Sequence, residues 1–261
     1  MIDIKKAKQE FKKYVKNYDI NDPKIQAKIA HIERTSRIAR QIAESLELEK
    51  DDMELAELIG LLHDIGRFEQ IKQYHTFVDK NSINHGELGA KILFKNGEIR
   101  RFIEDNKYDE IIKTSILNHN RNKENVQFSS EKEELHSKII RDADKTDILY
   151  ILTFEEKEVA WEKKDLSMDK ISNEIYREFT NRETINYKKR ETAADILVSH
   201  FAYIFDFNYK YGLQLIKEKG YLEQIYKRFK FDNPETENRF NNIYKIAKEY
   251  LESIGDDYDK K

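Results

Sequence analysis

The sequence contains no cysteine, only 2 proline and 8 glycine residues, and a single tryptophan among its 261 residues. The absence of cysteine excludes disulfides, thiolate metal sites and a cysteine nucleophile. A β-sandwich or barrel needs a turn about every 8–12 residues, and this chain has too few turn-forming residues to make them. We therefore expect an all-α fold.

The charges nearly cancel, since 47 Lys and Arg stand against 50 Asp and Glu and leave a net charge of −3. This balance gives no global attraction to nucleic acid or to an anionic membrane. Apolar runs are short: Ile148 to Leu152 cannot span a bilayer, and Met1 to Lys6 contains no apolar stretch of signal-peptide length. The sequence predicts a soluble, cytoplasmic protein with no membrane or nucleic-acid partner.

Apolar residues recur at helical spacing along most of the chain. This pattern predicts helices over roughly residues 3–18, 23–46 and 52–64. Asp22 is placed to cap the second of these helices, and Pro23 stands at its first position.

The segment 67–84 has no clean apolar period, so we expect a long ordered loop there. Further helices are predicted over 87–95, 100–105 and 109–119, and Ser130 with Glu133 forms a capping box that opens another. Three or four more helices should follow residue 168, before a frayed tail over 255–261.

No Pro- or Gly-rich linker divides the chain. We expect one bundle over residues 1–160 and a helical extension over residues 161–261, packed on it as a lid or serving as a homo-oligomer interface. Within this extension, residues 221–231 alternate Tyr and Phe with Lys and Arg, a pattern that can stack on single-stranded nucleic acid. The net charge favours the alternative, an amphipathic helix packed on the domain.

Without cysteine, a transition-metal site must be built from histidine and carboxylates. His63 and Asp64 end an apolar run that includes Leu61 and Leu62, and burying two such groups is costly unless a cation compensates them. Comparable positions, on the apolar faces or at the ends of expected helices, belong to His31, His85, His119 and Asp144. Four imidazoles and two carboxylates can hold two divalent cations and leave open positions for water.

Each of these residues taken alone also fits a simpler structural role. A lone histidine on an apolar face is more often a hydrogen-bonded core residue, and Asp144 can pair with Arg141 or Lys145. The adjacent pair carries more weight, and the six residues together favour a metal site. His136 and His200 fit no position in the pattern, and we expect them to be structural.

Over roughly residues 25–150 this ordered set resembles the HD superfamily of metal-dependent phosphohydrolases. The resemblance rests on His31-Ile32-Glu33-Arg34, Leu62-His63-Asp64-Ile65-Gly66-Arg67, His85-Gly86-Glu87, Asn118-His119-Asn120 and Arg141-Asp142-Ala143-Asp144-Lys145. It implies an all-α HD-domain bundle with two divalent ions, which can be Mn, Fe, Mg, Co or Ni. It further implies that Asp64 bridges the two, with His31, His63 and Asp144 on one ion and His85 and His119 on the other.

A dinuclear centre suits hydrolysis of a phosphate ester, because the ions lower the pKa of a water and clamp the oxygens of an in-line displacement. The expected substrate is a nucleotide or a small phosphorylated metabolite, as a phosphomonoester or a phosphodiester. Asp64 would orient the hydroxide and take its proton, Arg67 would offer a bidentate fork to a phosphate, and Lys145 a point charge. Arg34 and His75 are further candidates for substrate contacts.

Two other functions are compatible with parts of this pattern. A few HD proteins carry the same six ligands around two irons and act as oxygenases on small polar substrates, and ligand identity alone does not separate the two chemistries. A binding module with an inactive centre would lack ligands, and none is missing from the sequence.

Overall fold

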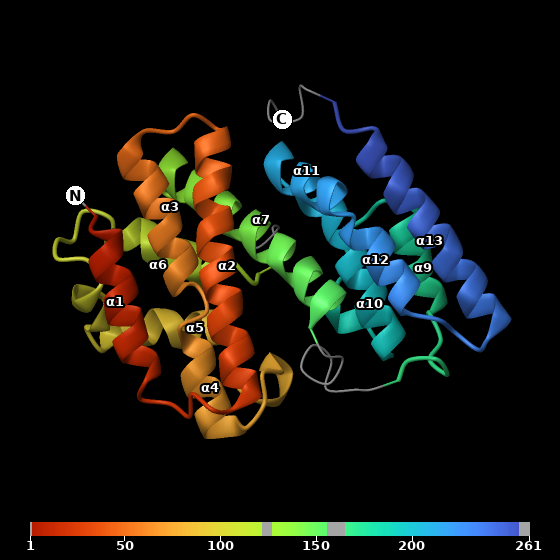
Figure 1. Ribbon diagram of the computed structural model, residues 1–261, viewed down its shortest axis with the longest axis horizontal. Coiled ribbons are helices and arrows are strands. Elements are labelled where there is room, and N and C mark those ends of the chain that lie inside the picture. The colour runs from red at the N-terminus through yellow and green to blue at the C-terminus, as the bar shows by residue number, and fades with distance from the viewer. Residues whose placement is uncertain (1, 122–126, 156–164, 256–261) are drawn as a thin grey trace. The chain divides into compact units, whose positions relative to one another are not determined.

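The computed structural model describes residues 2–121, 127–155 and 165–255. All regular structure within these ranges is helical (Figure 1), which confirms the expected all-α fold. The chain divides into two compact units, Met1–Asp144 and Lys145–Lys261. The division falls inside one helix, whereas the sequence analysis placed the boundary after residue 160. Each unit has its own apolar core.

The described part of the first unit contains six α-helices and the beginning of a seventh. They are α1 (Ile4–Val15), α2 (Pro23–Ser45), α3 (Lys50–Leu62), α4 (Gly66–Tyr74), α5 (His85–Ala90), α6 (Asp109–Asn118) and α7 (Glu131–Phe154). The predicted cap at Asp22 is confirmed, and the predicted capping box at Ser130 is confirmed in one of its two hydrogen bonds, because the Glu133 carboxylate accepts from the Ser129 amide instead of the Ser130 amide. The Asp22 side chain accepts a hydrogen bond from the Lys24 amide, and the Glu133 amide donates to the Ser130 hydroxyl at 3.2 Å.

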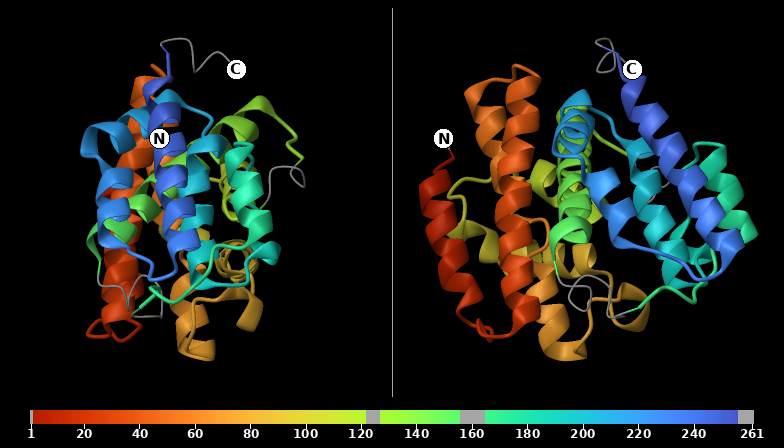
Figure 2. Two further views of the ribbon diagram at one scale, coloured as in Figure 1. Left: turned by 90° about the vertical axis from the view of Figure 1, so that its right-hand side faces the viewer. Right: turned by 45° about the vertical axis from the view of Figure 1, so that its right-hand side comes forward.

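The long helices α2 and α3 lie side by side, as Figure 1 and the right-hand view of Figure 2 show. Gly60 permits this approach, because a Cβ there would lie 2.6 Å from the Cα of Ser36. The Ser36 hydroxyl also donates to the Glu57 carbonyl at 2.7 Å. This packing brings His31, in the middle of α2, next to His63 at the end of α3.

The prediction of a loop over residues 67–84 is wrong in its first half, because α4 covers Gly66–Tyr74. The buried apolar side chains of α4 are Phe68 and Ile71, one turn apart. Two apolar positions are too few to show a helical repeat in the sequence. His75 then ends the helix with φ of 59°, and the rest of the segment holds one short 3₁₀ turn, Asp79–Asn81.

Two other predicted helices are shorter or differently wound than expected. α5 ends at Ala90 and continues as a π-helical turn over Lys91–Lys95. The helix predicted over residues 100–105 is a 3₁₀ turn at Glu98–Arg101. The helix predicted over residues 109–119 is confirmed as α6.

In its described residues the second unit contains the end of α7 and five further α-helices, whereas three or four were expected after residue 168. These are α9 (Asn173–Thr180), α10 (Ala193–Phe201), α11 (Lys210–Lys219), α12 (Tyr221–Arg228) and α13 (Pro234–Glu252), with 3₁₀ turns at Tyr187–Lys189 and Ala202–Asp206. Gly220, at φ of 63°, separates α11 from α12. Of the predicted frayed tail, residues 256–261 lie outside the described ranges.

The aromatic residues of the stretch 221–231 are part of the second core. Tyr221, Phe229 and Phe231 are buried, and the Tyr226 ring stacks on Tyr244 with centroids 4.3 Å apart. Lys227 pairs with Glu223 on the surface of α12. The rings therefore contribute to packing, as the amphipathic-helix interpretation expects. None of the helices in the described ranges is long and apolar enough to cross a membrane.

The start of α4 packs against α5 with no room for a side chain. A Cβ on Gly66 would lie 2.6 Å from the Gly89 amide nitrogen and would collide with the His85 carbonyl oxygen. We therefore expect Gly66→Ala to destabilise the protein by about 1–3 kcal/mol, as overpacking does. Chemical denaturation measures this. Gly255→Ala, where a Cβ has no neighbour within 4 Å, is the control and should leave stability unchanged. Equal midpoints for the two variants would contradict the close approach.

Candidate metal centre

Five helices of the first unit bring the six predicted ligands together. His31 lies on α2, His63 and Asp64 follow the end of α3, His85 opens α5, His119 follows the end of α6, and Asp144 lies on α7. The four imidazoles and Asp64 are each no more than 5% exposed. Side chains spread over 114 positions of sequence, from residue 31 to residue 144, thus meet in one apolar interior.

Asp64 lies between two groups of histidines. Its Oδ2 is 3.5 Å from His31 Nε2 and 3.7 Å from His63 Nε2. Its Oδ1 is 3.3 Å from His85 Nε2 and 3.6 Å from His119 Nε2. His31, His63 and Asp64 therefore form one set that can hold a cation, and Asp64, His85 and His119 form a second. One carboxylate is common to both.

Asp144 joins the first of these sets. Its Oδ1 is 3.1 Å from His31 Nε2 and 3.7 Å from His63 Nε2. Burial alone would raise the pKa of Asp144, but its contacts with His31 and His63 outweigh burial and hold that pKa well below its ordinary value. Asp144 is thus anionic, the form in which a carboxylate can bind a cation.

In three of the histidines the Nδ1 atom, which faces away from Asp64, is held by a hydrogen bond. His63 Nδ1 is 2.8 Å from the Gly60 carbonyl, His119 Nδ1 is 2.7 Å from the Ile116 carbonyl, and His85 Nδ1 is 2.7 Å from a carboxylate oxygen of Asp79. Carbonyl and carboxylate oxygens only accept, so each Nδ1 carries the proton and each Nε2 presents a lone pair. This is the arrangement in which imidazole binds a metal.

Two features of the second set fit a bound cation. His85 Nε2 and His119 Nε2 are 2.9 Å apart, so two lone pairs face each other. Asp64 Oδ1, directed at the same point, is buried and has no hydrogen-bond partner within the described residues. Unpartnered buried acceptors are costly. A divalent ion ligated by all three would remove the cost, so the residues present fit the metal that the sequence pattern implies.

The protonation states also suit metal binding. Burial lowers the pKa of His63, and burial together with the Arg67 charge lowers the pKa of His85 to about 3. Burial alone would raise the pKa of Asp64, but the charge of Lys28 and the contacts with the surrounding histidines together outweigh burial and hold that pKa well below its ordinary range. At neutral pH these side chains are neutral imidazoles and a carboxylate, the forms that coordinate cations.

Lys28 is a further charged residue at the cluster, and the sequence pattern did not indicate it. Its ammonium lies 2.8 Å from Asp64 Oδ2 and 5.5 Å from the centre of the Phe77 ring. Lys28 stands one turn before His31 on α2, and that spacing places both on the same helix face. This spacing was the available signal, but it does not single out one cation among 47 Lys and Arg.

The four residues proposed from the sequence to contact substrate have different environments. Arg67 lies near the cluster, with Nε 3.6 Å from Asp64 Oδ1, while its NH1 donates to Asp79, Gln70 and the Phe77 carbonyl. The Lys145 ammonium is buried against the carboxylate of Asp206. Arg34 is half-buried on α2, and His75 is exposed after α4. Their roles in substrate binding stay predictions.

The remaining histidines lie elsewhere. His136 is buried, and its Nε2 is 3.1 Å from Asp52 Oδ1. His200 packs edge-on against Tyr203 with ring centroids 5.2 Å apart.

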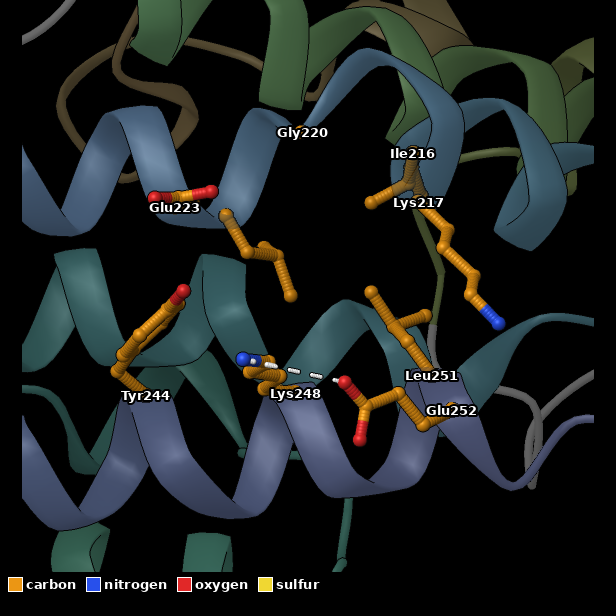
Figure 3. Close-up of a pocket in the computed structure, with 9 residues that line it drawn as sticks. Ile216, Lys217, Gly220, Glu223, Tyr244, Lys248, Leu251 and Glu252 are labelled. Carbon is orange, nitrogen blue, oxygen red and sulfur yellow. Dashed lines mark ion pairs between the residues drawn. The ribbon is translucent and has the colours of Figure 1, made fainter.

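A pocket of the second unit, between α11, α12 and α13, has a different character (Figure 3). Ile216, Leu222 and Leu251 line it together with a Lys248–Glu252 pair at 3.9 Å. Its lining contains no histidine. This pocket therefore offers no imidazole ligand for a metal.

Comparison with known proteins agrees with this geometry. Residues 29–149 match the family model described as the HD domain, and this segment contains all six residues. The chain therefore carries an HD domain, and the resemblance seen in the sequence is confirmed. HD domains bind divalent metals and are mostly metal-dependent phosphohydrolases, so the domain implies metal-dependent, hydrolase-type activity in general. No curated protein and no solved structure matched the chain.

The shared carboxylate leads to a prediction about metal content. Asp64→Ala should lose both ions, because both sets include Asp64. Replacing His85 and His119 together by Ala should leave about half the wild-type content. Elemental analysis of protein purified without chelator measures both, and His75→Ala, at an exposed position, is the control. Full metal content in Asp64→Ala would disprove the bridging role.

Proposed function

We propose that this protein is a dinuclear metal-dependent phosphohydrolase. Its substrate would be a phosphomonoester or phosphodiester of a nucleotide or of a small phosphorylated metabolite. The observation that carries the proposal is the position of Asp64, whose two oxygens face two separate sets of histidines. Two divalent ions bound there would supply Lewis acidity and bring the pKa of a water molecule close to neutrality.

The residues around the cluster would orient the attacking oxygen and bind the phosphoryl group. Asp64 is buried and shared by both sets, so it would orient the attacking oxygen. Lys28 and Arg67 reach Asp64 through opposite oxygens. Both would then lie beside the phosphoryl group, where they would neutralise charge on its oxygens. In this proposal the second unit acts as a lid or as a subunit interface.

Arg67 would contribute through part of its guanidinium only. Its NH1 is committed to the contacts with Asp79, Gln70 and Phe77. Its Nε is buried and has no hydrogen-bond partner in the described part of the chain. We therefore propose that Lys28 is the main phosphate-binding cation and that Arg67 assists it.

The reaction class is tested by assaying one metal-loaded preparation with and without oxygen. With Mn²⁺, we expect hydrolysis of nucleotide and sugar phosphates or of phosphodiesters at equal rates in air and under argon, because water is the only co-substrate. A chelator should abolish it. Two irons per chain with oxygen uptake and no hydrolysis would instead establish the di-iron oxygenase alternative.

The role of Lys28 is tested by Lys28→Met, which keeps the length of the side chain and removes its charge. Loss of a charge-assisted contact to phosphate should lower kcat/KM about tenfold, mainly through KM, while metal content is unchanged. Steady-state kinetics with elemental analysis measures both. Lys12→Met, on the exposed face of α1, is the matched control. Wild-type kinetics in Lys28→Met would exclude a role for Lys28 in binding substrate.

A further inference from the structure

Asp79, in the segment between α4 and α5, accepts hydrogen bonds from four side chains. Its Oδ1 is 2.9 Å from Arg67 NH1 and 2.9 Å from Gln70 Nε2. Its Oδ2 is 2.7 Å from His85 Nδ1 and 3.3 Å from Asn120 Nδ2. The partners come from α4, from the start of α5 and from the residue after His119. Asp79 thus connects the elements that carry the second histidine set.

His85 differs from His63 and His119 in how its ring is held. The latter two follow the ends of α3 and α6, and each donates to the carbonyl three residues before it. His85 is the first residue of α5, so its own helix has no preceding turn whose carbonyl it can reach. A side-chain carboxylate takes that place, and the side chain that supplies it is Asp79.

The carboxylate is itself firmly placed. Gln70 is fully buried, and its amide also donates to the Ser82 hydroxyl at 2.8 Å and to the Ile83 carbonyl at 3.0 Å. Arg67 donates through one nitrogen to Asp79 and to the Phe77 carbonyl. Both donors stand on α4, which directly follows His63 and Asp64. The position of Asp79 is therefore fixed relative to Asp64.

We propose that Asp79 is a positioning residue for the second metal subsite, which consists of Asp64, His85 and His119. Asp79 accepts a hydrogen bond from the Nδ1–H group of His85. This bond directs the Nε2 lone pair of His85 at the point that Asp64 Oδ1 and His119 Nε2 also face. The first subsite, with His31, His63 and Asp144, does not depend on it. This inference rests on the proposed dinuclear centre, but it concerns metal affinity and not the reaction.

The test is a calorimetric titration of the metal-free full chain with Mn²⁺. The wild type should show two binding steps. Asp79→Asn should weaken one step about 10–100-fold and leave the other unchanged, because loss of a partner that orients a ligand has effects of that size. His85→Ala should remove the same step. The double variant should bind like His85→Ala alone, because Asp79 acts through His85.

Asp52→Asn is the matched control, since Asp52 also accepts from a buried histidine, His136, in the first unit. It should keep both binding steps. If Asp79→Asn fails to fold, Asp79→Glu takes its place. This variant keeps a carboxylate for Arg67 and Gln70 but moves its oxygens relative to His85, so the same step should weaken.

Each alternative result has a definite meaning. Two unchanged steps in a folded Asp79 variant, or an additional loss in the double variant, would overturn the positioning role and leave the proposed function intact. A wild type that takes up no Mn²⁺ would overturn both. Selective loss of one step supports the inference whether or not a substrate has been found.

Discussion

The first unit is organised around a negative charge buried in an apolar interior. Asp64 is 3% exposed and follows α3, whose last two turns are almost entirely apolar. A carboxylate in that environment is tolerated only if cations or donors surround it. Lys28, Arg67 and four imidazoles approach it from α2, α4, α5 and the ends of α3 and α6. The helices are therefore arranged so that their polar side chains surround the Asp64 carboxylate and stabilise its charge.

Helix ends, more than helix faces, supply the ligands of this site. His63, Asp64, His85 and His119 all lie at or next to a helix terminus, where backbone groups lack partners within the helix. His63 and His119 use this directly, because each donates to a carbonyl of its own last turn. Close packing at Gly60 and Gly66 then brings the termini within reach of one another.

Most of this arrangement could be predicted because it depends on short capping motifs and on the spacing of apolar residues, and both can be recognised in the sequence. Asp22, Pro23 and Ser130 marked helix starts, and the pair His63-Asp64 at the end of an apolar run marked the site. The helix α4 escaped recognition because only two of its apolar residues are buried. Lys28 and Asp79 were missed for another reason. Lys28 contacts Asp64, which lies 36 residues further along the chain. Asp79 contacts His85 within an irregular segment that has no apolar period. Charge alone does not distinguish these two residues from the many other charged residues of the chain.

The hydrogen bonds that hold the three histidine rings differ in how they respond to mutation. Main-chain carbonyls orient His63 and His119, and no amino-acid substitution removes a carbonyl. The partner of His85 is a side chain in a loop of few buried residues. Over evolutionary time, a single replacement at Asp79 can therefore change how the His85 ring is held, while the carbonyls that hold His63 and His119 persist whatever side chains surround them. The orientation of one potential ligand can in that way drift through a loop residue, without a change in any of the six histidine and aspartate side chains.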